Sequence, residues 1–273
     1  MGRFDGKVAF ITGAARGQGR NHAIRLAEEG ADIIAVDICK QIDTIPYALS
    51  RPEDLEETVA LIEKLGRRVV AVEADVLDAA AMVAAVKQGV DELGRIDIVL
   101  ANAGVAPHSV DELDAVQVFM DTIAINLGGV RNAVAAAAPY MIAQGDGGAI
   151  VITSSTQGLS GAGGTGTGAT DGYVASKHGV VGLMRSWANW LAPHMIRVNT
   201  VHPTGVMTKM IDNESMGAFV AQSPHLADAM ANLMPVPVVD IEDITNAVLY
   251  LVSDDGRYVT GVTLPVDAGF GVK

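Results

Sequence analysis

A tyrosine and a lysine one helical turn apart are the residues of this sequence best suited to acid–base chemistry. Tyr173 and Lys177 occupy positions i and i+4 of the stretch DGYVASKHGVVGLMR. In the helix that we expect to begin near Asp171 or Gly172, their side chains share one face. A phenol has a pKa near 10, and a useful base at neutral pH requires a shift of about 3 units, roughly 4 kcal/mol in favour of the phenolate. A nearby ammonium acts in that direction, so we predict that Tyr173 transfers a proton with help from Lys177.

Two serines precede this pair at the end of an apolar run. Ser154 or Ser155 could donate a hydrogen bond to a developing alkoxide, and the residue register alone leaves both open. The glycine-rich segment 161–168, GAGGTGTG, separates them from Tyr173. We expect a strand to hold the serine and a helix to hold the tyrosine, so that this segment only connects two fixed ends. It is either a surface insertion or a part of the substrate site.

Three glycines near the N-terminus lie between an apolar run and an amphipathic stretch. Gly13, Gly17 and Gly19 would let the backbone approach a pyrophosphate closely, and the N-terminus of the following helix would offer unpaired N–H groups. The spacing is G-x-x-x-G-x-G instead of G-x-G-x-x-G, so the prediction rests on mechanism. A plain strand-to-helix turn is the alternative.

Asp37 ends the second apolar run, a short way after these glycines. A carboxylate there can accept hydrogen bonds from both hydroxyls of an adenosine ribose and repel a 2′-phosphate, which favours NAD over NADP. Arg16, within the glycine turn, could instead contact a phosphate. The alternative for Asp37 is an ordinary aspartate at the end of a strand.

Seven short β-branched runs alternate with amphipathic helical stretches. Runs that are apolar on both faces suit a parallel sheet covered on both sides, and no Pro/Ser-rich linker divides the chain. We predict one α/β domain over residues 1–273, with a doubly wound, seven-stranded, mostly parallel sheet and helices on both faces. The expected strands are 8–12, 32–37, 68–75, 96–103, 149–155, 196–202 and 262–267.

Two segments interrupt this alternation. Residues 38–52 form an insertion that is too long for an ordinary strand-to-helix turn. Residues 206–235 are rich in methionine, whose flexible thioether adapts to bulky apolar ligands. We interpret 206–235 as a lid over a hydrophobic substrate, and a helical pair packed on the body of the protein is compatible with that.

Composition excludes several classes of partner. The chain has 32 Asp and Glu against 19 Lys and Arg, a formal charge of −13, and no basic block, so we expect no nucleic acid and no membrane as a partner. With a single Cys39, no signal peptide and no metal-ligand spacing among six histidines, we expect a cytoplasmic protein without a metal. We assign His108 and His202 to loop or packing roles, and Trp187 and Trp190 to the core or an interface.

Taken in order along the chain, these motifs closely resemble the short-chain dehydrogenase/reductase family, and the resemblance covers essentially the whole chain. It implies a Rossmann-type fold and hydride transfer between NAD and an alcohol or ketone. The residues that carry it are the glycine turn, Asp37, Asp75, Asn102-Ala103-Gly104, Asn126, Ser155, Tyr173 and Lys177.

The resemblance implies a set of cofactor contacts. TGAARGQG at 12–19 resembles the family's cofactor turn, and residues 75–76 its adenine contact. ANAG at 101–104 has Ala101 where the family has a first Asn, and PTGVMT at 203–208 has Thr204 where it has Gly. The implied cofactor-binding residues are Gly13, Ala15, Arg16, Gly17, Gln18, Gly19, Asp37, Ile38, Cys39, Asp75, Val76, Asn102, Ala103, Gly104, Tyr173, Lys177, Pro203, Val206 and Thr208, of which the last two would face the nicotinamide carboxamide.

It also implies a catalytic set of Asn126, Ser155, Tyr173 and Lys177. In this set Asn126 orders a water next to the lysine. The family usually places its serine thirteen residues before its tyrosine, but here Ser155 precedes Tyr173 by eighteen, and the extra residues fall in the glycine-rich segment. Ser154 stays an alternative, although S-x-x-G at 155–158 favours Ser155.

Three stretches narrow the resemblance to carveol dehydrogenases and related mycofactocin-associated dehydrogenases: the insertion after Asp37, SSTQGLSG, and YVASKHGVVGLMR. This resemblance implies a terpene-like secondary alcohol or its ketone as substrate, and retained NAD that an external electron carrier re-oxidises. It also implies a homotetramer, for which the helices expected at 119–143 and 172–192 offer small-residue surfaces. The alternatives are a 3-oxoacyl or steroid reductase and, from another class, a non-catalytic nucleotide-binding scaffold.

Overall fold

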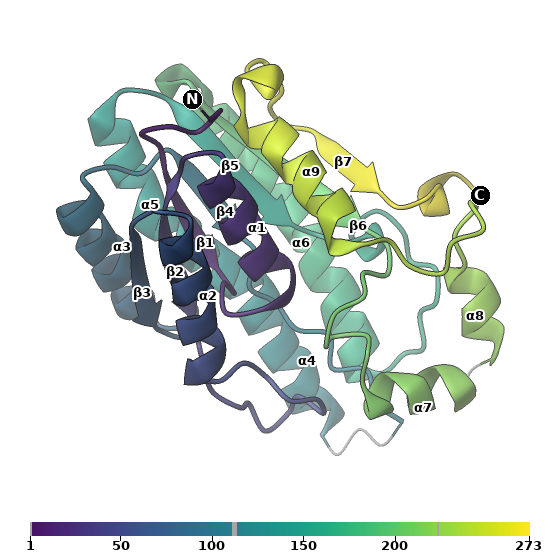
Figure 1. Cartoon of the computed structure of the whole chain (residues 1–273). Helices are drawn as coiled ribbons and strands as arrows, with labels where there is room; N and C mark the ends of the chain where they lie inside the picture. The colour runs from purple at the N-terminus through teal and green to yellow at the C-terminus, as the bar shows by residue number, and fades with distance from the viewer. Residues whose placement is uncertain (1, 111–113, 223) are drawn as a thin grey trace.

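A single parallel sheet organises the molecule (Figure 1). The computed structural model describes residues 2–110, 114–222 and 224–273. The strand order is β3-β2-β1-β4-β5-β6-β7, every pairing between these strands is parallel, and the predicted doubly wound α/β fold is confirmed. The strands are β1 Val8–Thr12, β2 Asp32–Asp37, β3 Val69–Glu73, β4 Ile98–Ala101, β5 Gly148–Thr153, β6 Ile196–Pro203 and β7 Thr263–Val266.

Helices cover both faces of the sheet. One face packs against α1 (Gly17–Glu28), α2 (Pro52–Lys64) and α9 (Ile241–Val252), through side chains such as Leu26 and Val248. The other packs against α3 (Ala79–Leu93), α5 (Val130–Gln144) and α6 (Gly168–Leu191), and α4 (Ala115–Ile123) packs on α6. Every residue of β1, β2 and β4 is buried, as continuous apolar runs require between two helical layers.

β1 and β4 are neighbours in the sheet. From β1 the chain continues outward through β2 and β3, and from β4 it continues in the opposite direction through β5, β6 and β7, so the strand order reverses between β1 and β4. In an open α/β sheet, this reversal leaves a crevice beyond the carboxyl ends of the strands. Thr12 closes the floor of that crevice, because its hydroxyl accepts hydrogen bonds from the N–H groups of Asn102 and Ala103, both at 3.1 Å. The glycine turn after β1 and the segment after β4 are thereby held together.

Some predicted boundaries were too long. The third, fourth and fifth strands end at Glu73, Ala101 and Thr153, two residues before the predicted ends. The helix that carries Tyr173 begins earlier than predicted, at Gly168, because the Thr167 hydroxyl caps it by accepting from the Thr170 N–H.

The remaining helices differ in detail from the expected pattern. Instead of one regular helix at 119–143, α4 continues through a π-helical segment, Ala124–Gly129, into α5. The methionine-rich segment forms two short helices, α7 (Glu214–Gln222) at the lower edge of the molecule in Figure 1 and α8 (Pro224–Met230) at the right, below the C-terminus. None of the described helices is both long and apolar enough to cross a membrane.

Candidate active site

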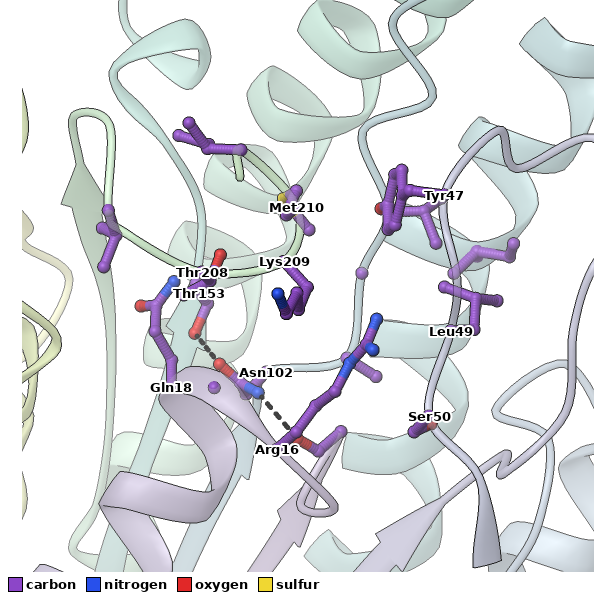
Figure 2. Close-up of a pocket in the computed structure, with 18 of the residues that line it drawn as sticks. Arg16, Gln18, Tyr47, Leu49, Ser50, Asn102, Thr153, Thr208, Lys209 and Met210 are labelled. Atoms are coloured by element: carbon purple, nitrogen blue, oxygen red, sulfur yellow. Dashed lines mark hydrogen bonds between the residues drawn. The ribbon is translucent and has the colours of Figure 1, made fainter. Parts of the chain in front are cut away.

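A cavity of about 460 Å³ opens at the carboxyl ends of the strands. Figure 2 shows side chains from the glycine turn, the insertion and the segment after β6 arranged around it. Most of the predicted site residues line it: Gly13, Arg16, Gly17, Gln18, Asp37, Ile38, Asp75, Val76, Asn102, Ala103, Gly104, Ser155, Tyr173, Lys177, Pro203, Val206 and Thr208.

Four predicted residues lie just behind the cavity wall. The Ala15 N–H donates to Asp37 Oδ2 at 2.9 Å, and the Cys39 N–H faces the other oxygen, Oδ1, at 3.3 Å. Gly19 packs on the turn itself, since a Cβ there would lie 2.0 Å from the Gly13 carbonyl oxygen. Asn126 is fully buried behind the segment after β4. These residues shape the groove without lining it.

The glycine turn needs its glycines for conformation as well as for space. Gly13 has a φ of +69° and Gly17 a φ of +58°, in the left-handed region that residues with a side chain rarely adopt. A Cβ on Gly13 would also lie 3.0 Å from the Ala103 Cα. The turn therefore leaves its backbone bare at the N-terminus of α1, which is the arrangement that receives a pyrophosphate.

The insertion at 38–52 is fixed to the groove at several points, which the sequence did not indicate. Ser50 donates a hydrogen bond to Asp37 Oδ1 at 2.5 Å, and Arg16 Nη2 donates to the Ala48 carbonyl oxygen at 2.6 Å. The buried Tyr47 accepts from the Ala106 N–H at 3.2 Å, and burial raises the pKa of Tyr47 to about 12. The insertion thus joins the end of β2, the glycine turn and the segment after β4.

Tyr173 and Lys177 lie on one face of α6, as the spacing predicts. The Lys177 Nζ lies 5.6 Å from the centre of the Tyr173 ring and donates to the Thr153 carbonyl oxygen at 2.8 Å. Burial lowers the pKa of Lys177 to about 8. Burial also raises the pKa of Tyr173, and a hydrogen bond with Ser155 opposes that shift. Desolvation of the phenolate is therefore the dominant influence on the pKa of Tyr173, contrary to the fall that we expected from the lysine.

The two serines have different partners. The Ser155 hydroxyl accepts from the Gln157 N–H at 3.1 Å, and Ser155 lowers the pKa of Tyr173. Ser154 turns away and donates to the Lys177 carbonyl oxygen at 2.9 Å. This contact ties the end of β5 to α6, while Ser155 presents its hydroxyl beside the phenol.

Asn126 lies in the π-helical segment between α4 and α5. Its amide forms a pair with the backbone of Val105, accepting from the N–H and donating to the carbonyl oxygen, both at 2.8 Å. Gly104 separates Asn126 from Lys177: a Cβ on Gly104 would lie 3.1 Å from Asn126 Oδ1 and 3.5 Å from Lys177 Nζ. Asn126 and Lys177 are thus neighbours across a bare backbone.

His108 lies between the phenol and the methionine-rich segment. Its ring stacks on Phe219 of α7, with centres 5.2 Å apart, and meets the Tyr173 ring edge-on at 5.8 Å. Ser215 of α7 donates to the His108 carbonyl oxygen at 2.8 Å. Burial lowers the pKa of His108 to about 4, so the ring is neutral at pH 7. His108 packs as predicted, and it packs directly beside Tyr173.

The glycine-rich segment lies against α8. Gly163 has a φ of +81°, and a Cβ there would lie 3.2 Å from the Met230 Cγ and 3.7 Å from the Leu226 Cδ2. Gln157 Nε2 donates to the Ala162 carbonyl oxygen at 2.8 Å, which holds the start of the segment near Ser155. The glycine-rich segment therefore connects the end of β5 with the methionine-rich segment.

Comparisons with known proteins agree with this geometry. The (-)-trans-carveol dehydrogenase of Rhodococcus erythropolis is 46% identical over 288 residues, covering all of both chains. A crystal structure of carveol dehydrogenase from Mycobacterium avium in complex with NAD is 50% identical, with a TM-score of 0.91, and one of a short chain dehydrogenase from Mycobacterium paratuberculosis bound to NAD is 43% identical, with a TM-score of 0.93. Both alignments cover all of each chain.

A protein-family model identifies the family of this chain. The model described as short chain dehydrogenase matches residues 7–217, which run from β1 to α7 and include the glycine turn, Ser155, Tyr173 and Lys177. The chain therefore belongs to the short chain dehydrogenase family.

Proposed function

We propose that this protein is an NAD-dependent oxidoreductase that interconverts a hydrophobic secondary alcohol and its ketone. The observation that carries the proposal is the cluster of Ser155, Tyr173 and Lys177 at the end of a groove that also contains the bare glycine turn and Asp37. The similarity to two proteins named carveol dehydrogenase supports this reaction class and a terpene-like alcohol as the substrate.

The groove fits NAD by the chemistry of its donors and acceptors. Asp37 keeps capacity for ribose hydroxyls, because a carboxylate has about four acceptor positions and its two oxygens meet three hydrogen-bond donors in the structure. The backbone of the glycine turn would hold the pyrophosphate, and Lys177 the nicotinamide ribose. When bound, NAD supplies the carbon that accepts the hydride.

The chain's own residues manage the proton. In alcohol oxidation Tyr173 takes the hydroxyl proton as a general base, and Ser155 donates a hydrogen bond to the oxygen that becomes negative. The Lys177 ammonium stabilises the phenolate and opposes the pKa rise caused by burial, and the positive charge of an oxidised nicotinamide would act in the same direction. Asn126 orders a water beside Lys177 that carries the proton onward. Ketone reduction uses the same groups in reverse.

The substrate side of the site favours an uncharged apolar molecule. Met207, Met210 and Ile211 line the cavity, and His108 with Phe219 forms an aromatic wall next to Tyr173. A 3-oxoacyl substrate on an acidic carrier protein would require a basic rim, and the formal charge of −13 offers little of that.

We also propose that the insertion retains NAD, so that an external electron carrier of the mycofactocin type re-oxidises it in place. The support is the set of contacts from Ser50, Ala48 and Tyr47 to the cofactor turn and its surroundings. Nucleotide that remains bound through purification, and is reduced by the alcohol without exchanging, would support this. A nucleotide-free preparation that exchanges added NAD rapidly would reject it.

A homotetramer in the cytoplasm completes the proposal. Val116 and Met120 are exposed apolar side chains one turn apart on α4, a face suited to a second copy, and Trp190 is exposed near the other end of α6. The buried free thiol of Cys39 suits a reducing compartment. Light scattering at micromolar concentration checks the assembly, and a monomer mass would contradict it.

A substrate panel tests the reaction. Cyclic terpene alcohols, steroids and 3-oxoacyl thioesters are each assayed with NAD and NADP, with and without an artificial electron acceptor. We expect turnover of terpene alcohols that requires NAD or retained nucleotide. Preference for an acyl thioester would favour the reductase alternative, and bound nucleotide without turnover of any substrate would favour a scaffold.

A further inference from the structure

Residues 105–108, which follow β4, are held by two segments that are distant in the sequence. The Tyr47 hydroxyl, from the insertion, accepts from the Ala106 N–H at 3.2 Å. The Ser215 hydroxyl, from α7, donates to the His108 carbonyl oxygen at 2.8 Å. Within the segment, the His108 N–H donates to the Ala106 carbonyl oxygen at 2.9 Å. A loop that only connects two elements can leave such backbone groups to water, so these contacts give His108 a fixed place.

The ring of His108 connects α7 with the phenol of Tyr173. It meets the Tyr173 ring edge-on, with centres 5.8 Å apart and an angle of 65° between the planes. It stacks on Phe219, with centres 5.2 Å apart and an angle of 22°. Both separations fall in the range of about 4.5 to 7 Å in which aromatic rings attract each other. Because Phe219 is itself buried on α7, the His108 ring is supported on the side of that helix.

The polar atoms of the His108 ring do not explain its place beside Tyr173. Nδ1 is buried and has no hydrogen-bond partner among the described residues. Burial also lowers the pKa of His108 to about 4, so the ring is uncharged at pH 7. The contact with Tyr173 therefore acts through the shape of the ring and not through its charge.

The phenol of Tyr173 needs support beyond that of its own helix. α6 fixes the backbone of Tyr173, but the side chain can turn about two bonds and occupy several staggered rotamers. A displacement of a reacting group by about 1 Å can lower a rate about 10²-fold. A neighbouring ring that blocks the other rotamers would prevent such a displacement.

We propose that His108 is a positioning residue for the general base Tyr173. Its ring excludes alternative rotamers of Tyr173 and keeps the phenol oxygen beside Ser155, while Tyr47 and Ser215 hold His108 in place from the insertion and from α7. The inference rests on the proposed function, because that function makes Tyr173 the base.

Steady-state kinetics distinguish positioning of the base from a contact with the substrate. The probe is the terpene alcohol that turns over fastest in the substrate panel. The variants are His108→Ala and His108→Phe, of which the second keeps an aromatic ring without nitrogens. His178→Ala, at an exposed histidine on α6, is the control. If His108→Ala does not fold, His108→Leu takes its place.

The expected result is a loss of rate that an aromatic ring restores. We expect His108→Ala to lower kcat by about 10- to 100-fold, with little change in KM and in the Kd for NAD, and His108→Phe to recover most of the rate. Equal losses of kcat in the two variants would overturn the proposal, because they would mean that an imidazole nitrogen is needed. A change confined to KM would also overturn it, because His108 would then act only as a wall for the substrate.

A double-mutant cycle tests the link between α7 and the base. Loss of one neutral hydrogen bond corresponds to a factor of about 2 to 12, so we expect Ser215→Ala to lower kcat by a factor in that range. In the His108→Ala background the same change should have no further effect, because the Ser215 hydroxyl acts through His108. Independent, multiplying losses would overturn this link.

Crystal structures of the wild type and of His108→Ala provide a readout that does not depend on activity. We expect Tyr173 to occupy one rotamer beside Ser155 in the wild type, and a different rotamer or several in the variant. An unchanged Tyr173 in the variant would overturn the proposal even if the variant were slow. Wild-type protein that oxidises no alcohol of the panel would instead reject the proposed function, and the inference with it.

Discussion

The imidazole Nδ1 of His202 lies 2.7 Å from the carbonyl oxygen of Ser155. Burial lowers the pKa of His202 to about 4, so at pH 7 the ring is neutral and its single N–H can donate to that oxygen. Thr200 Oγ1 lies 2.8 Å from Nε2 and can donate to it, which fixes the tautomer. Through this contact β6 supports the backbone from which Ser155 presents its hydroxyl.

Removal of the imidazole should therefore affect turnover more than cofactor binding. We expect His202→Ala to lower kcat about tenfold, the order of one lost buried hydrogen bond, with the Kd for NAD nearly unchanged. His202→Asn places an amide N–H close to the position of Nδ1 and should recover most of the rate. Steady-state kinetics and NAD titration check both variants. Similar rates for the two would show that the hydrogen bond does not position Ser155.

Removal of one oxygen from Tyr173 should abolish the chemistry. A positioned general base contributes about 10²- to 10⁴-fold to a rate, so we expect Tyr173→Phe to lose turnover by at least that lower factor while NAD still binds. Tyr258→Phe, at an exposed tyrosine, is the matched control. Stopped-flow absorbance at the wavelength of reduced NAD measures the hydride step directly. A Tyr173→Phe variant with wild-type turnover would remove the basis of the proposed mechanism.

The contact between Ser50 and Asp37 should slow the release of NAD. A hydrogen bond to a charged group contributes about 1.5 to 3 kcal/mol, so Ser50→Ala should release NAD about tenfold faster or more. Release can be followed by fluorescence after mixing with an excess of competing nucleotide. Ser186→Ala, an exposed serine on α6, is the control. An unchanged release rate would show that the insertion does not hold the cofactor through this contact.

Gly163 offers a test of the contact between the glycine-rich segment and α8. Gly163 and Gly166 both have positive φ, +81° and +72°, but only at Gly163 would a Cβ meet Met230, whereas nothing lies within 4 Å at Gly166. Alanine at either position introduces backbone strain of about 1 kcal/mol. We expect Gly163→Ala alone to raise KM for the alcohol severalfold. Equal KM changes in the two variants would point to strain instead of displacement of α8.

Acid should destabilise the fold through buried histidines. His22 is 1% exposed, and burial lowers its pKa from 6.5 to about 3. Between pH 6.5 and 3, His22 is protonated in the unfolded chain but not in the folded chain. The free energy of unfolding therefore falls as the pH falls, by up to about 1.4 kcal/mol per pH unit. Urea unfolding at pH 7, 6 and 5 measures this slope. His22→Gln should flatten it relative to His194→Gln, an exposed control, and an identical slope in both would contradict this origin.

The centre of the sheet was predictable from the sequence because β1, β2 and β4 are buried on both faces. These strands are short, mainly apolar runs, and polar residues such as Asp37 and Asn102 stand where the runs end. The parallel order then brings these ends to one edge. Sequence spacing likewise sufficed for Tyr173 and Lys177, which depend only on the helix period.

The parts that the sequence did not indicate depend on contacts between distant segments. Ser50 and Tyr47 lie in an insertion without periodicity, and Tyr47 meets Ala106 across 59 residues of sequence. The pKa of Tyr173 was expected to fall, but it rises in the protein alone, because the extent of burial is set by packing that no local pattern encodes.

Ser155 directly follows β5 and Tyr173 lies on α6, so the loop between them is not needed to hold either residue in place. The hydrogen bond from Ser154 to the Lys177 carbonyl oxygen locks strand and helix together without help from that loop. Its length can therefore drift during evolution while the reaction is conserved, and a protein engineer could exchange it to retune selectivity. Counting residues between Ser155 and Tyr173 is, for the same reason, an unreliable way to recognise such a site.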